Sequence, residues 1–237
     1  MATPVAAQLI ELQDLDTRLD RLGLARRNAP EHGQLDAARS DAQQAAQRRA
    51  ERQARFGTID EQIAANEKES EQLGVTRDRL QAQLRTVFAT REAEALMHEI
   101  DTINARRGEL DDAELAALEE QEQLMSELDA DESTEPQRVE AVGAAQAALD
   151  EVLADFDSQI AAAQEDRKSR VAAVSAATVA RYERLRSKLG GVGVARLDGR
   201  QCTGCHLDLS PGELDLVRHA ADDELVECPQ CSRLLVR

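Results

Sequence analysis

The chain is almost without aromatic residues, with one tyrosine, three phenylalanines and no tryptophan among 237 residues. A compact domain of this length normally buries several aromatic side chains, because these supply much of the apolar area of a core. Here the apolar residues are mostly leucine, alanine and valine, and 32% of the chain is charged. This composition is typical of long helices and coiled coils rather than of a single compact domain.

Long apolar runs are also missing. The first residues, MATPVAAQLIELQDLD, have no basic start and no apolar stretch long enough for secretion or for crossing a membrane. We therefore expect a cytoplasmic protein without membrane contact. Thiols stay reduced in that compartment, so paired cysteines there bind metal more often than they form disulfides.

The signatures of an enzyme are absent as well. The sequence has no phosphate-cradling glycine loop and no G-x-S-x-G motif, and its many carboxylates follow helical faces rather than a plausible pocket. His32 and His98 are isolated within helical sequence. We predict a protein that is not an enzyme and has no small-molecule substrate.

From Val5 to about Lys188 the sequence has the features of long α-helices, with few interruptions. Apolar residues recur there in steps of three and four, the spacing of a heptad seam. Because such a seam is buried only against another helix, the helices must pair within the chain or between chains, and the oligomeric state stays open. The clearest run is Val139, Val142, Leu149, Leu153, Phe156, Ile160 and Ala163, and the other members are Val5, Leu9, Leu12, Leu15, Leu19 and Leu22, then, with gaps, Leu73, Leu80, Leu84, Val87, Leu96, Ile100, Ile103 and Leu110.

Three segments that disfavour a continuous helix divide this region. The segment GLARRNAPEHG (23–33) contains a proline and two glycines, which predicts the end of a first helix. TVFAT (86–90) clusters β-branched and aromatic residues, and Thr90 can cap a new helix. DADESTEP (129–136) offers Ser133 as an N-cap with a proline in the following turn.

Arm length decides which break is the main turn. A reversal near residues 86–91 leaves two arms of about 80 residues, each about 120 Å long at ~1.5 Å per residue. A reversal at 129–136 would leave arms too unequal to cover each other. The predicted fold is therefore mainly α, with a long kinked antiparallel coiled-coil hairpin over 1–189, its tip near 86–91 and a kink at 129–136. A three-helix arrangement is the alternative.

All cysteines of the chain lie near its C-terminus, in two C-x-x-C pairs formed by Cys202 with Cys205 and by Cys228 with Cys231. Glycines after Lys188 mark a joint, and alternating sequence around both pairs predicts β-hairpins with the cysteines at their turns. Two such turns that face each other give four thiolates in a tetrahedron, which suits one structural Zn²⁺ at Zn–S distances of ~2.3 Å.

We therefore predict a second domain, a small β-rich zinc ribbon over 190–237. The segment SPGE supplies a capping residue, Ser210, then proline and Glu213, which predicts a short helix from Pro211 to about Ala220. No aromatic residue follows Gly191, so the metal must replace much of a core. A structural zinc ion contributes ~10–16 kcal/mol of apparent binding energy to folding.

Other readings of the cysteines fit less well. A rubredoxin-like iron site uses similar turns, usually with aromatic packing that this chain lacks. A thioredoxin-like redox pair requires C-x-x-C at a helix N-terminus after a strand, which neither pair has. Four thiolates leave no open coordination position, so catalysis by the metal is not expected, and His206 is interpreted as a turn residue.

Charge is uneven along the chain, whose net charge is −17. Residues 109–135 hold twelve acidic and no basic residues, whereas 167–200 hold nine basic and two acidic residues. We interpret the acidic run as solvation, and the basic window either as a candidate site for an anionic partner or as a solvated face paired with the acidic arm. The candidate partner-binding residues are Arg181, Tyr182, Arg184, Arg186, Lys188, Arg196, Arg200 and Arg233.

Four segments resemble a known family. They are TREAEALMHEI (90–100), RYERLR (181–186), CTGCHLDLSPGEL (202–214) and CPQCSRLL (228–235), and in them the chain resembles the bacterial four-cysteine zinc-ribbon proteins with an N-terminal coiled-coil hairpin. Ser232 stands where that family commonly has glycine. The resemblance implies an adaptor that binds nucleic acid or a component of the transcription machinery, such as an alternative sigma factor.

The leading hypothesis is a zinc-stabilised adaptor for RNA or DNA. Its basic window would neutralise phosphates and Tyr182 would stack on a base. Against it, residues 196–237 hold five arginines and eight acidic residues, and zinc with four thiolates adds about −2. The alternatives are a protein–protein adaptor, for example for a sigma factor, and a structural rod that dimerises through its seams.

Overall fold

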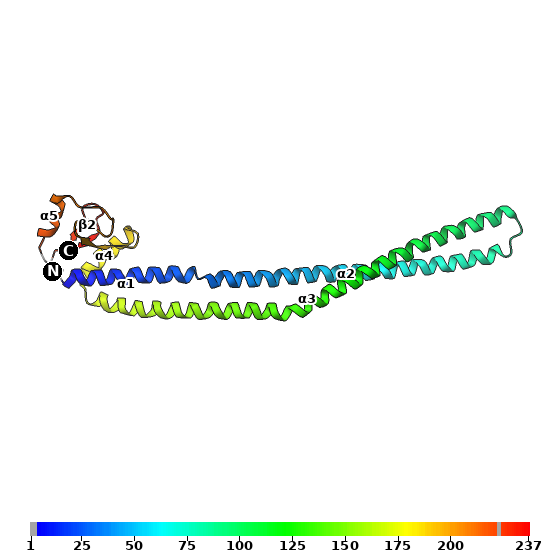
Figure 1. Cartoon of the computed structure of the whole chain (residues 1–237), viewed down its shortest axis with the longest axis horizontal. Coiled ribbons are helices and arrows are strands. Elements are labelled where there is room, and N and C mark those ends of the chain that lie inside the picture. The colour runs from blue at the N-terminus through cyan, green and yellow to red at the C-terminus, as the bar shows by residue number, and fades with distance from the viewer. Residues whose placement is uncertain (1–3, 222–223) are drawn as a thin grey trace. The chain divides into compact units, whose positions relative to one another are not determined.

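The computed structural model describes residues 4–221 and 224–237 of the chain (Figure 1). Four helices come first, and a small region of short strands with one further helix follows. The elements are α1 (Pro4–Arg27), α2 (Pro30–Leu84), α3 (Thr90–Ala172), α4 (Ala176–Lys188), β1 (Val194–Asp198), β2 (Gln201–Cys202), α5 (Pro211–His219), β3 (Val226–Glu227) and β4 (Leu234–Val236). The predicted fold, a long helical hairpin followed by a four-cysteine β-rich ribbon, is confirmed. Among the described residues, no helix combines the length and apolar character that a membrane span needs.

The hairpin reverses at residues 85–89, between α2 and α3, where the sequence predicts its tip. By contrast, α3 continues without interruption through 129–136 and contains Pro136. Ser133 does not cap a new helix there, because its hydroxyl donates a hydrogen bond to the Ala130 carbonyl oxygen at 2.8 Å. The chain therefore reverses at 85–89 and not at 129–136.

The chain divides into two compact units. We call residues 1–34 and 146–237 the ribbon unit, and residues 35–145 the tip unit. The ribbon unit contains the zinc-ribbon region together with α1, the end of α3 and α4. The domain boundary predicted from the sequence, at 189/190, instead marks the point where helical sequence changes to alternating sequence. Each unit is described below by itself.

The tip unit has a thin core. Leu80 of α2 clusters with Ile100 and Ile103 of α3, and these residues are among the predicted seam positions. Val139, another predicted seam residue, is 65% exposed instead. The buried apolar residues of this unit are Leu35, Ala45, Ile59, Leu80, Ile100, Ile103 and Leu110.

Ion pairs flank the core of the tip unit. Arg55 of α2 makes a two-pronged contact with Glu120 of α3, with both distances 2.7 Å. Arg52 pairs with Glu127 at 2.7 Å and with Asp131. The acidic run at 109–135 is thus not only solvated, as the sequence suggested, because part of it neutralises arginines of α2.

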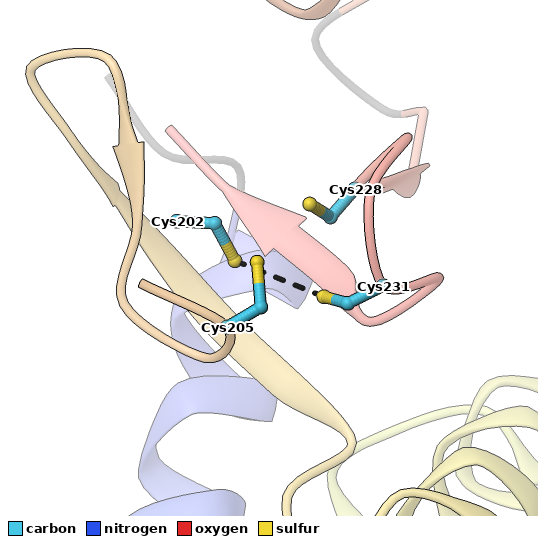
Figure 2. A group of neighbouring side chains, drawn as sticks. All are labelled: Cys202, Cys205, Cys228 and Cys231. Carbon is cyan, nitrogen blue, oxygen red and sulfur yellow. Dashed lines mark hydrogen bonds between the residues drawn. The ribbon is translucent and has the colours of Figure 1, made fainter. Parts of the chain in front are cut away.

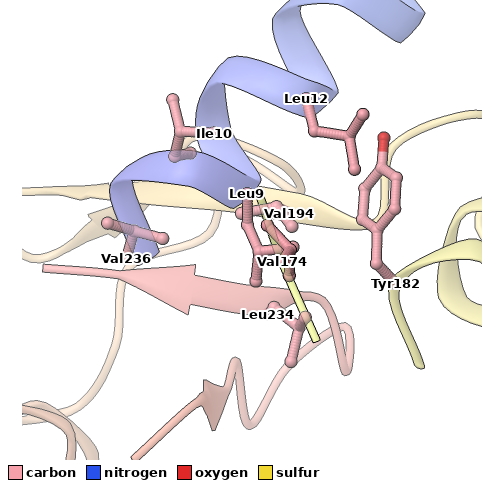
Figure 3. Close-up of a cluster of buried hydrophobic side chains, with 8 residues drawn as sticks. All are labelled: Leu9, Ile10, Leu12, Val174, Tyr182, Val194, Leu234 and Val236. Carbon is pink, nitrogen blue, oxygen red and sulfur yellow. The ribbon is translucent and has the colours of Figure 1, made fainter. Parts of the chain in front are cut away.

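The ribbon unit has a broader core, built where α1 meets the sheet (Figure 3). Leu9 and Leu12 of α1 are fully buried, together with Tyr182 of α4. Val194 of β1 and Leu234 of β4 complete the same cluster, with Ile10, Val174 and Val236 beside them.

The small sheet has the strand order β2-β1-β4-β3. The two central strands, β1 and β4, are parallel, and each pairs with an antiparallel strand on its outer side. Successive residues of a strand point to opposite faces. Accordingly Val194 and Leu234 belong to the core with α1, whereas Ala195 and Leu235 belong to a second core with the cysteines and α5. The sheet therefore lies between α1 and the metal centre.

Candidate metal centre and the joint beside it

The two C-x-x-C segments form turns with the same hydrogen bonds. The Cys202 amide donates to the Leu207 carbonyl at 3.1 Å, and the Cys228 amide donates to the Arg233 carbonyl at 2.8 Å. In return, the amides of His206 and Ser232 each donate to the carbonyl of the first cysteine, both at 2.8 Å. Each hairpin turn therefore holds its two cysteines in the same way.

The four sulfurs converge on one point (Figure 2). All of them lie within 4.8 Å of one another, and the sulfurs of Cys202 and Cys231 are 4.0 Å apart. A tetrahedral zinc ion with Zn–S bonds of ~2.3 Å separates its sulfurs by ~3.8 Å, so the arrangement fits this ion. The predicted ligand set of Cys202, Cys205, Cys228 and Cys231 is brought together as expected.

The thiols differ in how readily they ionise. Burial raises the pKa of Cys202 and raises that of Cys228 to about 12. Burial also acts to raise the pKa of Cys231, but hydrogen bonds with Arg233, Cys228 and Cys205 together outweigh it and lower the pKa of this thiol to about 7. Zinc binds thiolates, and its positive charge offsets the cost of ionising the buried pair.

The residue after each second cysteine adopts a left-handed backbone conformation. His206 has φ of 59° and Ser232 has φ of 60°. Glycine adopts this conformation most easily, so His206 and Ser232 hold their turns at some conformational cost. His206 is a turn residue, as predicted, and it is not part of the sulfur cluster.

The helix α5 is fixed to the metal centre through its first turn. Ser210 accepts a hydrogen bond from the Glu213 amide, and the Glu213 carboxylate accepts one from the Ser210 amide at 2.8 Å. This is the predicted capping box. Glu213 also accepts a hydrogen bond from the Gln230 side chain at 2.8 Å, which connects α5 to the second cysteine turn.

The glycine-rich joint before the sheet is held by Gln13 of α1. The Gln13 amide group donates to the Gly191 carbonyl at 2.9 Å, and its oxygen accepts from the Gly193 amide at 2.7 Å. A side chain at position 193 would meet the Tyr182 carbonyl oxygen at 2.9 Å, so only glycine fits there. The joint is thus a packed segment rather than a loose linker.

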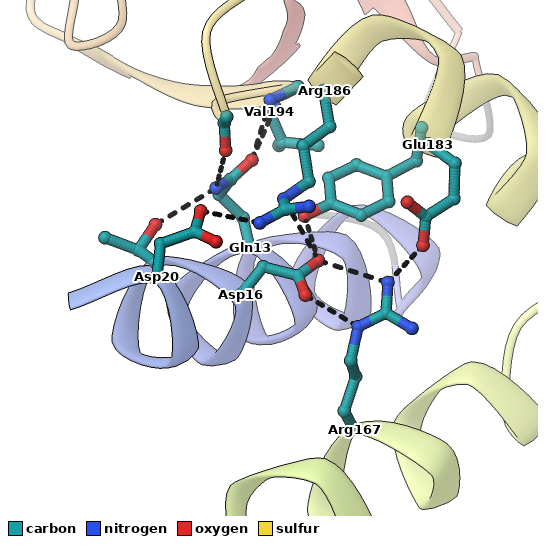
Figure 4. A network of polar contacts seen from close by, with 11 residues as sticks. Gln13, Asp16, Asp20, Arg167, Glu183, Arg186 and Val194 are labelled. Carbon is teal, nitrogen blue, oxygen red and sulfur yellow. Dashed lines mark hydrogen bonds and ion pairs between the residues drawn. The ribbon is translucent and has the colours of Figure 1, made fainter. Parts of the chain in front are cut away.

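A buried carboxylate lies next to this segment (Figure 4). Asp16 of α1 is 2% exposed and accepts hydrogen bonds from the Tyr182 hydroxyl and from Arg167, both at 2.6 Å. Arg186 approaches Asp16 at 3.6 Å and pairs with Asp20 at 2.6 Å. A buried charge is tolerated only when it is paired and hydrogen-bonded, and Asp16 meets both conditions.

Sequence reasoning did not identify Gln13 or Asp16. A signal was available, because Leu9, Leu12, Asp16 and Leu19 follow steps of three, four and three residues. An acidic residue in an apolar seam indicates a buried partner, although the sequence does not say which residue that partner is.

The structure corrects the expected role of Tyr182. Its side chain is fully buried, so it cannot stack on a base, and the prediction that it does is wrong. Burial, followed by the hydrogen bond to Asp16, raises its pKa far above the usual value. Tyr182 serves the core that joins α4 to α1.

Most of the other candidate partner-binding residues are occupied within the chain. Arg181 pairs with Glu227 at 2.8 Å, and Arg186 pairs with acids of α1. Arg233 donates hydrogen bonds to the carbonyls of residues 189 and 192 at 2.8 and 2.9 Å. The remaining pairs are Arg196 with Asp14 at 3.4 Å and Arg200 with Asp208 at 3.1 Å.

Arg184 and Lys188 differ from this group. Both are exposed, and neither has a carboxylate partner among the residues that the structure describes. The eight candidates therefore do not form one open cationic surface. The structure fits a basic window whose charges are mostly paired within the chain better than it fits an open site for an anionic partner. The acidic partners of these cations lie on α1 and in the ribbon rather than in the 109–135 segment.

Comparison with known proteins places both parts of the chain. The family model of the CT398-like coiled coil hairpin domain matches residues 12–190, and that of the C4-type zinc ribbon domain matches residues 201–235. An uncharacterized protein of Mycobacterium tuberculosis strain H37Rv is 33% identical over 242 residues, which cover 100% of this chain and 98% of the relative. The two models describe a coiled coil hairpin and a zinc ribbon, and neither description names an enzymatic activity.

Solved structures agree with this result. A protein from Mycobacterium smegmatis has a TM-score of 0.81 at 27% identity, with 100% of both chains covered. CT398 from Chlamydia trachomatis has a TM-score of 0.82 at 21% identity, over 98% of this chain and 96% of that one, and it supports the fold alone. The chain belongs to the family of CT398-like coiled coil hairpin proteins, and its C4-type zinc ribbon provides four cysteines for one structural zinc ion.

Proposed function

We propose that this protein is a non-enzymatic, zinc-stabilised adaptor that binds another protein through its ribbon. The observation that carries the proposal is Leu216 of α5, which is 75% exposed while its neighbour Val217 is buried in the ribbon core. Leu216 lines an open groove together with Val226 and Pro229. An apolar side chain over an apolar groove on a small domain is typical of a contact surface for a protein.

Charge favours a protein over nucleic acid as the partner. Within the basic window and its neighbour Arg233, most cations already have acceptors in the chain, as described above. The groove itself is bordered by Asp215 and Glu224, and by Glu227, whose charge is paired with Arg181. Phosphate groups are repelled by such a border, whereas a protein segment with an apolar side chain next to lysine or arginine complements it.

The family resemblance suggests the class of partner. It points to components of the transcription machinery, so an alternative sigma factor from the same organism is the first candidate to test. The hairpin then acts as a scaffold, and the ribbon as the domain that recognises the partner.

Binding of a purified sigma factor to the zinc-loaded chain tests the proposal by calorimetry at two salt concentrations. We expect Leu216→Gln to weaken binding about tenfold or more, since it removes an anchor from the centre of the contact. Leu207→Gln is the matched control, because Leu207 is 52% exposed but does not line the groove. Zinc content should be unchanged in both variants. Equal affinities of the Leu216 variant and the wild type would contradict the proposal.

A second candidate function rests on Arg184 and Lys188, which are four residues apart on α4 and exposed without carboxylate partners among the described residues. Two free cations on one helix face offer a small site for phosphate groups. Binding of nucleic acid at this site is measured by fluorescence anisotropy with labelled RNA and DNA at two salt concentrations. Salt-sensitive binding that is lost in Arg184→Ala/Lys188→Ala would support nucleic-acid binding.

The control for that pair is Lys68→Ala/Arg79→Ala. It removes the same charge from exposed positions of α2. If both double variants lose binding equally, the interaction reflects net charge only, and the α4 site is rejected.

A further inference from the structure

The helix α3 carries a second heptad line in the tip unit, besides the buried seam that contains Leu110. From residue 111 to residue 129 its members alternate in steps of four and three residues. Steps of this kind place side chains on one face of a helix. We call this line the outer seam, and it consists of Asp111, Leu115, Leu118, Glu122, Met125 and Asp129.

The three apolar members of the outer seam face solvent. Leu115 is 60% exposed, Leu118 is 44% exposed and Met125 is 53% exposed, whereas Leu110 of the buried seam is 3% exposed. The outer seam is displaced from the line of Leu110 by one residue, about 100° around the helix, and a helix that packs on one side only normally shows polar residues on every face outside its packed stripe. Two leucines and a methionine at heptad spacing on such a face are therefore unexpected, and they indicate a partner.

The acidic members of the outer seam are also unpaired. Glu120, Glu127 and Asp131 of the same helix are all engaged by arginines of α2. By contrast, none of the carboxylates of the outer seam has a cationic partner within the described part of the chain; these are Asp111, Glu122 and Asp129. The outer seam thus presents apolar side chains between uncompensated negative charges.

We propose that the outer seam binds an amphipathic helix of a partner protein, with apolar residues at heptad spacing and lysine or arginine opposite the acids. The heptad period specifies a helix, because a strand would need alternate residues on one face. The charges specify a basic helix, because unpaired acids attract cations and reject a second acidic surface. A second copy of the outer seam would set acid against acid and is therefore excluded as the occupant.

This surface uses none of the residues of the ribbon groove. Its binding helix and the ribbon's partner can belong to one protein or to two. The proposal therefore stands or falls independently of the function assigned to the ribbon.

The test uses the full zinc-loaded chain and a labelled synthetic helix of about four heptads, with leucine at the seam positions and lysine beside them. A second peptide keeps the leucines and replaces the lysines by glutamate. Anisotropy titrations at low salt should show that the basic peptide binds about tenfold or more tightly than the acidic one.

Two variants locate the site. Leu115→Gln/Leu118→Gln should weaken binding of the basic peptide about tenfold. Asp111→Asn/Glu122→Gln/Asp129→Asn should remove most of the preference for the basic over the acidic peptide, because it neutralises the charges that make the distinction.

Each variant has a matched control on α2. Val75→Gln replaces an apolar residue that is 68% exposed but lies outside the outer seam. Glu61→Gln/Glu67→Gln/Glu71→Gln neutralises three exposed carboxylates, the same change in charge. Both controls should bind the basic peptide like the wild type.

Three results would overturn the proposal. The first is binding that is the same in the wild type and in Leu115→Gln/Leu118→Gln. The second is an equal loss in the seam variants and their controls, which would mean that only net charge is sensed. The third is a dimer in sedimentation that Leu118→Gln dissociates, because the outer seam would then be covered by a second copy.

Discussion

In the tip unit each helix packs mainly against one other helix, whereas in the ribbon unit α1 also contacts the strands β1 and β4 and the helix α4. The difference appears in what is buried. Gln13 and Asp16 are the buried polar residues of the described chain, and both belong to the ribbon unit. The arginine–acid pairs of the tip unit, by contrast, retain contact with solvent.

The same kind of heptad sequence therefore serves two purposes. Where a helix packs against only one other helix, the seam gives a thin core. Each layer of seam residues then contacts only the layers next to it, so the free energy of unfolding is close to a sum of local contributions, as in repeat proteins. Where strands also pack on the helix, polar residues become buried, and each of them depends on partners far away in the sequence. We expect the ribbon unit to respond to single substitutions much more strongly than the tip unit.

Loss of the metal should give the largest difference between the two units, because it destabilises the ribbon unit and leaves the tip unit unchanged. Cys205→Ser removes one zinc ligand, and with it most of the ~10–16 kcal/mol that a structural zinc ion contributes. We expect the ribbon to unfold and hydrogen exchange to rise at Leu9 and Leu12, which pack on its strands. Helix content measured by circular dichroism should fall only slightly, since the tip unit does not use the metal.

The control for this variant is His206→Asn, which keeps all ligands and places a residue that tolerates the left-handed conformation at the turn. It should retain one zinc ion per chain. A large loss of helicity in Cys205→Ser would show that the two units are not independent in stability.

The second largest loss of stability should come from changing the buried carboxylate of Asp16. Asp16→Ala should lower the free energy of unfolding by about 2–3 kcal/mol, because Tyr182 and Arg167 lose their shared acceptor inside the protein. Chemical denaturation with a probe in each unit measures this change. Asp157→Ala is the control, since its partner Arg26 is at the surface. Similar losses in the two variants would contradict the distinct role of Asp16.

Alkaline pH should produce a smaller effect that is specific to the ribbon unit. Tyr182 is the sole tyrosine, so its ionisation can be followed by absorbance without interference. Burial and the hydrogen bond to Asp16 raise its folded-state pKa, so its contribution to stability is complete below the unfolded pKa of about 10 and declines as the pH rises above it. We expect no phenolate in the folded protein at a pH at which the denatured chain has ionised. Phenolate at about pH 10 without unfolding would contradict the burial of this side chain.

The smallest effect should come from the ion pairs of the tip unit. Arg55→Gln removes the two-pronged contact to Glu120, in which the side chains are 47% and 42% exposed. Exposed pairs are weak and screened by salt, so the melting temperature of the tip unit should fall by no more than about 2–4 °C, and the difference should shrink in high salt. A loss as large as that of Asp16→Ala would remove the contrast between the units.

Features with local signals could be predicted from the sequence. The cluster around residues 86–90 marks a break, and the balance of arm lengths identifies this break as the hairpin tip. The zinc site follows from cysteine spacing, and α5 from its capping residues. Apart from the arm lengths, each of these signals involves residues that are close in sequence, or identical ligand types whose pairing needs no further information.

Features that depend on distant partners could not be predicted in the same way. Tyr182 follows an arginine on a basic helix, so in sequence it resembles a binding residue, yet its hydroxyl bonds to Asp16, 166 residues away. The charges of the basic window likewise looked free because their acceptors lie on α1 and in the ribbon. A residue's accessibility depends on which segments pack against it, and the residues next to it in the sequence do not show which segments these are.

The central position of β4 has a consequence for biosynthesis. This strand, Leu234–Val236, pairs with β1, and Leu234 is buried in the core that contains Leu9. A chain that emerges from the ribosome can close the hairpin of the tip unit as soon as α3 appears. By contrast, the part of α1 that packs on Leu234 and Val236 stays uncovered until β4 has been made, even when Val174 and Tyr182 already cover the rest. The first helix to be synthesised is thus among the last to complete its contacts, and during that interval it is the segment most in need of protection by a chaperone.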